Sequence, residues 1–371
     1  MRLTHTKMKI AHVVDSMEVG GAETLVAQMC YGQRELGHAP CVLAVAALGS
    51  IGARLRDEGF SVQANVGSHL FDAVRNFYHL FKELRPDVVH LHNPTPTIYA
   101  ALPARLAGAV SIVSTRHSLV APPRKRTEEL KYAVASLFCD WVVGVCDATT
   151  MNIRSMHGIL SRKIVRVYNG VVPLRRVPIE ACPAKTGFTL LYAGRLEPVK
   201  NHALLFEAFR IAQCSMPDLR LWMVGDGSER STLENLAAEL GIAGQVTFWG
   251  QQDDVAPFFS CADALVMSSR SEGLPLSLLQ GFSLGVPAIV TDVGGMAEAV
   301  RLAGAGLIVP VTEPGRMGAA VLEMAGDRDG RKRFAENAEA GFAAHFSFER
   351  MLDGYMDLYC KSRDRTRPQN A

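Results

Sequence analysis

Short apolar segments alternate with amphipathic helical segments along almost the whole chain, and this alternation constrains the fold more than any other feature. Buried, β-branched runs occur at residues 10–14, 87–91 and 111–115. Between them, residues 71–84 place six apolar side chains on one face at helical spacing. Strands that alternate with helices of about 10–15 residues are typical of βαβ units. The sequence therefore predicts an α/β protein with parallel sheets.

The alternation is interrupted once, at residues 171–186, where the sequence VVPLRRVPIEACPAKT contains three prolines. Such a stretch is typical of a linker, and the strand–helix pattern restarts after it. A chain of 371 residues is long enough for two cores. We therefore expect two doubly wound domains, residues 1–178 and 179–371, with ligands at the carboxyl ends of their strands.

Composition excludes several classes of protein. There is no uncharged apolar run of 18 residues, so no transmembrane helix is expected. The first residues lack the apolar segment and cleavage site of a signal peptide. The eight cysteines are scattered without a C-x-x-C pair, which favours reduced core cysteines and argues against a zinc site. We expect a cytoplasmic protein that does not bind nucleic acid.

The net charge of +2 conceals an asymmetry between the two halves. Residues 1–178 contain 21 Lys and Arg against 13 Asp and Glu, a balance of +8, whereas residues 179–371 contain 18 against 24, a balance of −6. A basic half can meet an anionic partner, such as a membrane surface or a phosphorylated acceptor. The alternative is a solvated basic face that has no partner.

Residues 268–295 combine a polar loop, a short apolar helix and a buried strand. Pro275 suits the first position of the helix, so the amides around Gly273 and Leu274 would point out of its start, where an anion can bind. Glu272 lies just outside and would repel a phosphate, which favours hydrogen bonds from the hydroxyls of a phosphate-linked ligand. The alternative is an ordinary loop with an exposed glutamate.

A second loop, GRLEPVKN, joins a strand to a helix and begins at Gly194. Arg195 offers a planar fork of donors and Lys200 a compact charge, a combination suited to a pyrophosphate. Two surface cations near a helix start are the alternative.

Gly20 and Gly21 would let the backbone approach a ligand at another helix start. Neither this pair nor the Gly-Asp-Gly at residues 225–227 forms a G-x-G-x-x-G motif, so no dinucleotide cofactor is indicated.

Three histidines, His90, His92 and His117, lie at or just past strand ends. The first two could ligate a metal, but no third ligand accompanies them at an informative spacing, which favours structural or substrate-contacting roles. His117 is the best candidate for contact with a substrate. Asp327 and Asp329 match a D-x-D metal signature by letters only and are interpreted as helix caps. No arrangement for a covalent nucleophile is present.

Taken in order, these stretches resemble the retaining glycosyltransferases of family 4, whose GT-B fold has two facing Rossmann-like domains and a C-terminal helix that packs back toward the first. The resemblance covers nearly the whole length and is carried by VGG, DVVHLHNP, TRHS, YNGV, AGRLEPVKN, VGDGSER, VTFWG and SEGLPLSLLQGFSLGVPAIVTDVGG.

The resemblance implies a role for each matching residue. Arg195 and Lys200 would grip the donor diphosphate, Glu272 with the amides of Gly273 and Leu274 would hold sugar hydroxyls, and His117 would contact the transferred sugar. Further donor contacts are implied for Gly20, Gly21, Gly194, Gln280 and Gln251. The implied substrates are a nucleotide diphosphate sugar and a glycan or lipid-linked acceptor, with no cofactor and no metal.

The sequence departs from the family at Gln280, where a second glutamate usually binds the nucleotide ribose. An amide can still bridge two hydroxyls, but neutral hydrogen bonds are about half as strong as charge-assisted ones. The departure keeps open a catalytically weak nucleotide-sugar-binding partner protein, and a nucleotide-sugar epimerase of the same architecture is a further alternative. Arg124, Lys125 and Arg126, shortly after His117, suggest that the first domain rests on anionic lipid at the inner face of the membrane.

Overall fold

The computed structural model describes residues 7–64, 66, 70–119 and 126–366, which form two compact units. One unit comprises the chain up to Tyr168 together with the segment from Glu349 onward, and the other comprises Asn169–Phe348. The units thus separate ten residues before the boundary expected from the linker, and the C-terminal helix belongs to the first unit.

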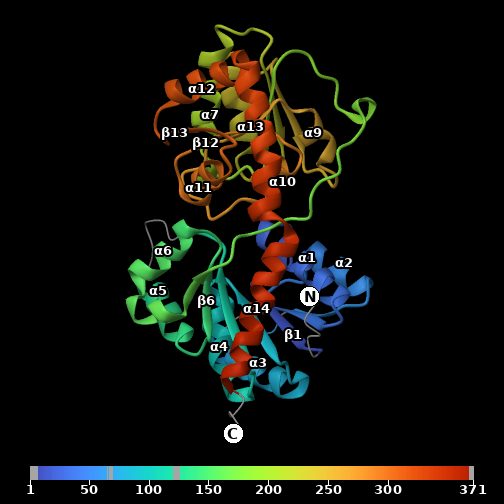
Figure 1. Ribbon diagram of the computed structural model, residues 1–371, viewed down its shortest axis with the longest axis vertical. Helices are drawn as coiled ribbons and strands as arrows, with labels where there is room; N and C mark the ends of the chain where they lie inside the picture. Colours follow the sequence, from blue (N-terminus) through green and yellow to red (C-terminus); the bar gives the residue numbers. More distant parts are fainter. Residues whose placement is uncertain (1–6, 65, 67–69, 120–125, 367–371) are drawn as a thin grey trace. The chain divides into compact units, whose positions relative to one another are not determined.

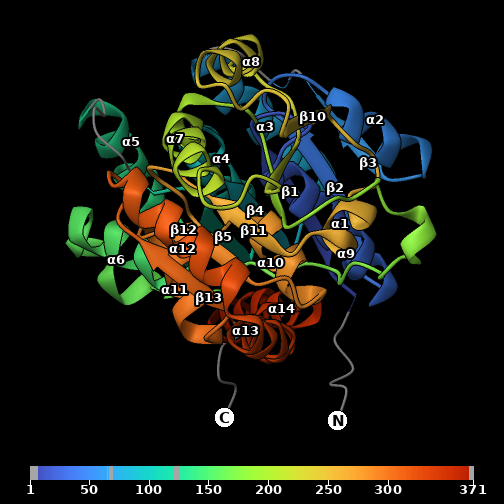
Figure 2. The ribbon, with the colours of Figure 1, turned by 90° about the horizontal axis from the view of Figure 1, so that it is seen from above.

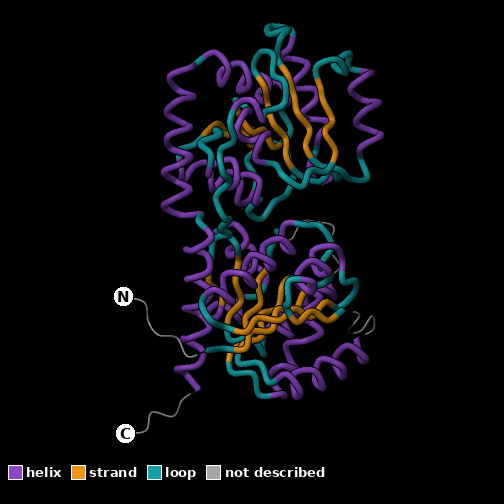
Figure 3. Tube along the Cα trace, turned by 90° about the vertical axis from the view of Figure 1, so that its right-hand side faces the viewer, coloured by secondary structure: helices purple, strands orange, loops and turns teal. Residues whose placement is uncertain are grey.

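The sheet of the first unit is parallel, in the order β3-β2-β1-β4-β5-β6-β7. Its described helices flank the strands (Figures 1 and 3). The strands are β1 Lys9–Val14, β2 Ala39–Ala44, β3 Ser61–Gln63, β4 Val88–His92, β5 Ser111–Arg116, β6 Trp141–Gly144 and β7 Ile164–Arg166. The helices are α1 Gly21–Glu35, α2 Gly49–Asp57, α3 Leu70–Leu84, α4 Pro94–Ala107, α5 Arg126–Ser136, α6 Asp147–Met156 and α14 Phe348–Thr366.

Alternate residues of these strands serve two different cores, as the pleat of a sheet requires. Ala11, Val13 and Leu43 pack with side chains of α3, α4 and α5. Val42 and Ala44 face the other way and pack with α1 and α2. Because both faces are covered, the central strands are buried along almost their whole length, which explains their continuous apolar sequences.

Helix α14 completes the first unit from the far end of the chain (Figure 1). The hydroxyl of Tyr359 lies 2.7 Å from His90 Nδ1, and the Trp141 indole donates to the Leu358 carbonyl at 3.2 Å. Both tyrosines of this helix that face the strands, Tyr355 and Tyr359, are buried. The expected packing of the C-terminal helix on the first domain is confirmed.

The second unit contains a parallel sheet in the order β10-β9-β8-β11-β12-β13. Helices α7 and α12 pack against each other beside it (Figures 1 and 2). Its strands are β8 Thr189–Ala193, β9 Arg220–Val224, β10 Val246–Gly250, β11 Ala264–Met267, β12 Ala288–Thr291 and β13 Gly306–Val309. Its α-helices are α7 His202–Gln213, α8 Arg230–Glu239, α9 Ala256–Cys261, α10 Leu276–Ser283, α11 Gly294–Ala303, α12 Pro314–Gly326 and α13 Arg328–Gly341.

In each sheet the order of strands reverses at one place, between β1 and β4 in the first unit and between β8 and β11 in the second. Chain connections leave the sheet in opposite directions at such a switch point, and the loops that follow the two strands diverge. The loops at these two places are therefore the first positions to search for ligand contacts.

The cysteines correct one expectation. Cys182 and Cys261 form a disulfide with their Cα atoms 6.1 Å apart, so the expectation of eight reduced cysteines is wrong for this pair. The two positions are 79 residues apart in sequence and meet only through the fold. The other six cysteines, all among the described residues, lie outside this disulfide.

Among the described residues, no helix is both long enough and apolar enough to cross a membrane.

Candidate active site

The loop after β8, which carries Arg195 and Lys200, is held in place by backbone hydrogen bonds to the loop after β9. The amide of Gly194 donates to the Val224 carbonyl at 2.9 Å, and the amide of Leu196 donates to the Asp226 carbonyl at 2.9 Å. In addition, the hydroxyl of the buried Tyr192, on β8, donates to the Arg195 carbonyl at 2.8 Å. The backbone at Arg195 is thus fixed, while its side chain is exposed.

The glycines of the Gly225-Asp226-Gly227 segment permit this close packing. Gly225 has φ +130°, and a Cβ there would collide with the Gly194 carbonyl, while a Cβ at Gly227 would collide with the Leu196 carbonyl. Only glycine lets the two backbones approach so closely. The close backbone packing therefore requires glycine at both positions, which the sequence pattern alone did not indicate.

The structure brings Lys200 and Glu272 together from opposite sides of the switch point. Lys200 Nζ donates to Glu272 Oε1 in an ion pair whose side chains are 15% and 13% exposed. The Ser269 hydroxyl donates to the same carboxylate oxygen at 2.8 Å. Glu272 is therefore not the exposed loop glutamate of the alternative interpretation.

Hydrogen bonds to backbone carbonyls join this loop to its neighbours. The Ser268 hydroxyl donates to the Lys200 carbonyl at 2.8 Å, and the Arg270 amide donates to the Val199 carbonyl at 2.9 Å. On the other side, the Thr291 hydroxyl donates to the Ser269 carbonyl at 2.7 Å. The loops after β8, β11 and β12 thus form one connected layer at the carboxyl edge of the sheet.

Helix α10 begins at Leu276, one residue later than the sequence suggested, and Pro275 is its N-cap with φ −66°. No side chain caps the helix start, so the first turn keeps amides directed outward. Gln280 lies one turn further and is half-buried, whereas Gln251 is exposed just after β10. Gly273 and Leu274 are buried, and the Leu274 carbonyl accepts from Asn169 at 2.9 Å.

In the first unit, Gly20 is the N-cap of α1 and Gly21 its first residue. The Glu23 carboxylate lies against Gly20 and occupies the space that a Cβ at this position would need. A carboxylate in the first turn interacts favourably with the helix dipole. A phosphate at this helix start would therefore have to displace the Glu23 side chain.

His117 follows the buried strand β5, as expected, and its backbone amide donates to Asn93 Oδ1 at 3.2 Å. Its ring Nε2 lies 3.1 Å from His92 Nδ1. Burial lowers the pKa of His117 to about 4. The ring is therefore neutral at neutral pH.

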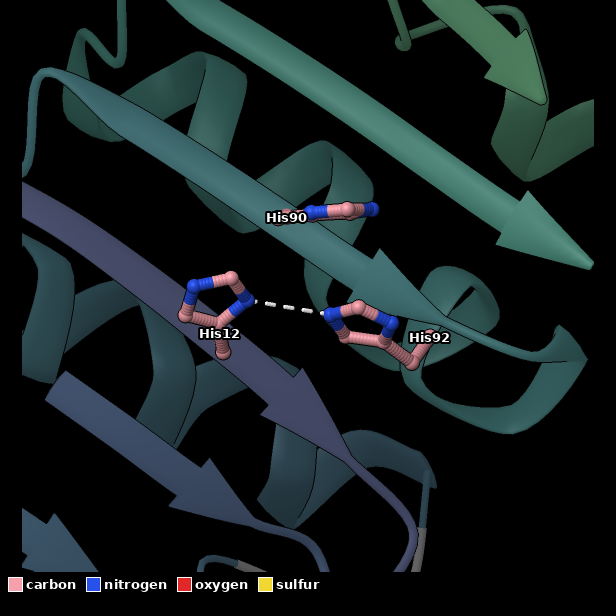
Figure 4. Close-up of side chains that lie close together, drawn as sticks. All are labelled: His12, His90 and His92. Carbon is pink, nitrogen blue, oxygen red and sulfur yellow. Dashed lines mark hydrogen bonds between the residues drawn. The ribbon is translucent and has the colours of Figure 1, made fainter. Parts of the chain in front are cut away.

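His12, His90 and His92 gather at the first switch point, where one ring nitrogen of each lies within 4.8 Å of one ring nitrogen of the other two (Figure 4). His12 Nδ1 lies 3.0 Å from His92 Nε2, and His12 Nε2 lies 2.8 Å from Gln33 Oε1. His90 is occupied separately, by Tyr359 and by the Thr115 hydroxyl, each at 2.7 Å. Every ring nitrogen of the three is thus within hydrogen-bond distance of a protein partner.

Sequence reasoning missed His12 and Gln33. The register pairs His12 with His90 across β1 and β4, so a histidine in the middle of a buried first strand, followed by H-x-H in a later one, is the signal that could have indicated the cluster. Nothing in the local sequence marks Gln33, which lies on α1 and is fully buried.

Two other expectations concern loops. Asp327 caps α13 through an accepted hydrogen bond from the Gly330 amide at 2.8 Å, which confirms its interpretation as a cap, whereas Asp329 lies in the first turn of the helix. Arg124 and Lys125 lie outside the described residues, and only the backbone of Arg126 is described, at the start of α5.

Two family models match consecutive parts of the chain. Residues 19–174 match the model described as Glycosyltransferase Family 4, and residues 181–341 match Glycosyl transferases group 1. Together they include both candidate loops. The chain belongs to the family 4 glycosyltransferases. The expectation of a family 4 glycosyltransferase is thereby confirmed.

Individual relatives of this glycosyltransferase are also named as glycosyltransferases. It is 34% identical over 165 residues to the lipopolysaccharide core biosynthesis glycosyltransferase LpsE of Rhizobium meliloti, a match that covers 44% of this chain and 47% of LpsE, about half its length. It is 24% identical over 307 residues to the UDP-Gal:alpha-D-GlcNAc-diphosphoundecaprenol alpha-1,3-galactosyltransferase of Escherichia coli, covering 76% and 78% of the two chains.

Among solved structures, Anabaena HepE in complex with UDP-glucose superimposes with a TM-score of 0.81 at 19% identity, over 95% of this chain and 100% of HepE. A likeness at this identity concerns the fold. It confirms the GT-B class, with two Rossmann-like units, for this glycosyltransferase.

Proposed function

We propose that this glycosyltransferase transfers a hexose-type sugar from a nucleotide diphosphate sugar to a glycan or lipid-linked acceptor in cell-surface polysaccharide synthesis, with retention of the anomeric configuration. The observation that carries the proposal is the Lys200–Glu272 pair, which stands with the Arg195 loop at the switch point of the second sheet.

The chemistry of these groups matches the two ends of a sugar diphosphate. Lys200 uses one of its three donors on Glu272, which leaves others for phosphate oxygens. The exposed guanidinium of Arg195 and the uncapped start of α10 add further donors for an anion. Glu272 has lone pairs left for sugar hydroxyls. One compact edge thus offers donors for phosphate and acceptors for hydroxyls.

Retention follows in this proposal from a reaction on one face of the sugar. The bond between the anomeric carbon and the diphosphate oxygen breaks, the acceptor oxygen bonds to the same face, and the acceptor proton passes to the departing diphosphate. The protein must stabilise developing negative charge, which preorganised donors achieve effectively. Because the positive charges of Arg195 and Lys200 can stabilise the departing diphosphate, we propose that transfer needs neither a protein nucleophile nor a metal.

HepE and the Escherichia coli relative suggest which donors to test first. HepE was solved with UDP-glucose, and the Escherichia coli relative is named for UDP-Gal. We therefore propose a uridine diphosphate hexose as donor, with Gln280 at the ribose and Gln251 near the base. In the first unit, we propose that His117 contacts the transferred sugar and that Gly20 and Gly21 approach the diphosphate after Glu23 moves aside.

The acceptor is proposed from two observations, the basic charge of residues 1–178 and the lipid-diphosphate acceptor in the name of the Escherichia coli relative. We propose a cytoplasmic enzyme that works at the inner face of the membrane. Binding to anionic vesicles that weakens as salt rises would support the membrane surface, and no binding at low salt would remove it.

The deciding experiment is a donor screen by thermal shift followed by product identification. A ligand that binds only the folded state raises Tm, so one UDP- or GDP-hexose should stabilise the protein more than the free nucleotide. Mass spectrometry with that donor should then detect acceptor-dependent transfer in the presence of EDTA. An isomerised sugar without acceptor would indicate the epimerase, and binding without any turnover would indicate the catalytically weak partner.

A further inference from the structure

Four buried or half-buried side chains in the first unit form a continuous hydrogen-bonded series from the interior to His117. Gln33 Oε1 lies 2.8 Å from His12 Nε2, His12 Nδ1 lies 3.0 Å from His92 Nε2, and His92 Nδ1 lies 3.1 Å from His117 Nε2. We call these residues the Gln33 chain. Figure 4 shows its central link, with the rings of His12 and His92 directed toward each other from neighbouring strands.

Each imidazole of the Gln33 chain carries a single proton. Burial lowers the pKa of His12 to about 4, although the Gln33 hydrogen bond opposes this, and burial lowers the pKa of His117 to about 4. Burial and then the neighbouring histidines lower the pKa of His92 well below its usual value. A neutral imidazole has one donor nitrogen and one acceptor nitrogen. The proton position of one ring therefore determines that of the next.

The amide of Gln33 gives the chain its direction. The atom of this amide next to His12 is Oε1, at 2.8 Å from the ring Nε2, while no hydrogen bond of the Gln33 Nε2 is recorded among the described residues. An amide oxygen can only accept. His12 must then donate from Nε2 and accept at Nδ1, His92 must donate from Nε2, and His117 must donate from its Nε2 as well.

We propose that Gln33 is a positioning residue that fixes the tautomer of His117 through two intervening imidazoles, so that His117 Nδ1 presents a lone pair. Among the described residues, no hydrogen bond to this nitrogen is recorded. It is therefore suited to accept from a hydroxyl of the bound sugar. This last step rests on the proposed function, whereas the tautomers themselves do not.

The remaining histidine of the cluster lies beside this series. His90 is engaged by Tyr359 and Thr115, and Thr115 donates in turn to Tyr355 at 3.2 Å. A metal at His12, His90 and His92 would have to replace these bonds as well as those of the Gln33 chain. In a metal-bound neutral imidazole the ion occupies one nitrogen and the proton the other. The tautomer measurement described next therefore distinguishes a metal site from the hydrogen-bonded Gln33 chain.

The test is ¹⁵N NMR of the full protein labelled at histidine, in which a protonated ring nitrogen and one with a lone pair differ strongly in chemical shift. A His117→Ala variant identifies the His117 signals. We expect wild-type His117 protonated at Nε2 and bare at Nδ1, unchanged after addition and removal of EDTA. A proton on Nδ1, or signals that change when a metal is chelated, would overturn the proposal.

Three variants on α1 then test the role of Gln33. Gln33→Met removes the acceptor with little change in volume and should leave His117 as a mixture of tautomers. Gln33→Glu keeps an acceptor and should restore the wild-type tautomer. Gln28→Met is the matched control, because the Gln28 Oε1 has no hydrogen-bond partner among the described residues. A wild-type tautomer in Gln33→Met would contradict the proposal.

Activity supplies a separate readout. Loss of one well-oriented hydrogen bond corresponds to about a tenfold change, so Gln33→Met should lower kcat/KM about tenfold, and Gln33→Glu should recover most of it. If His117→Ala transfers sugar normally, the sugar contact in the proposed function is wrong, while the tautomer result still decides the role of Gln33. If the tautomers shift in Gln33→Met but kcat/KM stays unchanged, the link from tautomer to sugar fails.

Discussion

At the scale of single residues, the pairing of Lys200 with Glu272 changes how the candidate site is understood. The sequence grouped Lys200 with Arg195 as two cations for a diphosphate and treated Glu272 separately. The structure instead joins Lys200 to Glu272 in a largely buried pair and leaves the Arg195 guanidinium exposed. Arg195 is therefore available to a ligand at once, while Lys200 is oriented in advance by a carboxylate.

Arg195→Ala should lower kcat by about 10²-fold or more, the size of effect seen when one donor to a developing oxyanion is removed. Because the side chain is exposed, the fold should be unaffected. Arg210→Ala is the matched control, since Arg210 pairs with Glu207 on the surface of α7. Steady-state kinetics with the identified donor would measure both, and near-normal turnover of Arg195→Ala would exclude the diphosphate role.

Lys200→Met should reduce both turnover and stability, because it leaves the Glu272 carboxylate largely buried without its partner. Breaking a buried ion pair destabilises by about 3 kcal/mol, which urea unfolding would detect. In the double variant Lys200→Met with Glu272→Gln, the stranded charge is gone, so stability should recover while turnover stays low. Recovery of turnover together with stability would show that the pair is only structural.

Gln280→Glu should keep activity, with an equal or lower KM for the donor. The carboxylate would replace neutral hydrogen bonds to ribose hydroxyls by charge-assisted ones, which are about twice as strong. Donor KM and kcat, measured side by side with wild type, check this. A clear loss of turnover would mean that Gln280 does not lie at the ribose.

At the scale of elements, the site depends on loops that contact one another's backbone closely. The loop after β8 contacts the loop after β9 through Gly225 and Gly227, and it contacts the loop after β11 through Ser268 and Arg270. A displacement of any one loop would therefore shift the others. Positions that touch no ligand can still affect donor binding by this route.

Gly227→Ala tests this coupling. Its Cβ would meet the Leu196 carbonyl, and overpacking of this kind destabilises by about 1–3 kcal/mol. We expect lower stability in urea and a raised donor KM. Gly244→Ala is the control, because nothing lies within 4 Å of a Cβ there. Equal behaviour of the two variants would show that the loop contact can relax.

Elements were predictable from sequence to a greater extent than contacts between side chains. Apolar runs and helical spacing indicated the strands, and Pro275 was misplaced by only one residue at the start of α10. The residues of two separate loops indicated Arg195 and Lys200 in one and Glu272 in the other. By contrast, the contacts of His12 with Gln33 and of Cys182 with Cys261 join distant segments. Local sequence patterns do not indicate such contacts, because distant segments meet only once the chain has folded.

At the scale of the whole molecule, buried neutral histidines in both units relate stability to pH. His12 in the first unit and His202 in the second are almost fully buried. Burial lowers the pKa of each to about 4, and the Lys200 charge adds to the effect at His202. In an unfolded chain they titrate near 6.5. Between these values the unfolded state binds more protons, so stability falls as pH falls.

Each of these histidines should therefore lower the free energy of unfolding by about 2 kcal/mol between pH 7.5 and pH 5. Urea unfolding at the two pH values measures the total change, to which other histidines whose pKa is lowered by burial, among them His90, His92 and His117, also contribute. His202→Phe keeps an aromatic ring against Tyr192 and should lose less stability on acidification than wild type. An identical pH dependence in the variant would show that His202 does not contribute.

The path of the chain through its two units also bears on how the protein is made. Residues 169–348 are contiguous, whereas the first unit needs Tyr355, Tyr359 and the rest of α14 to cover His90 and Trp141. On the ribosome, the part translated second can therefore finish folding before the part translated first. In the nascent first unit, the surface that α14 covers therefore stays exposed until this helix has been synthesised.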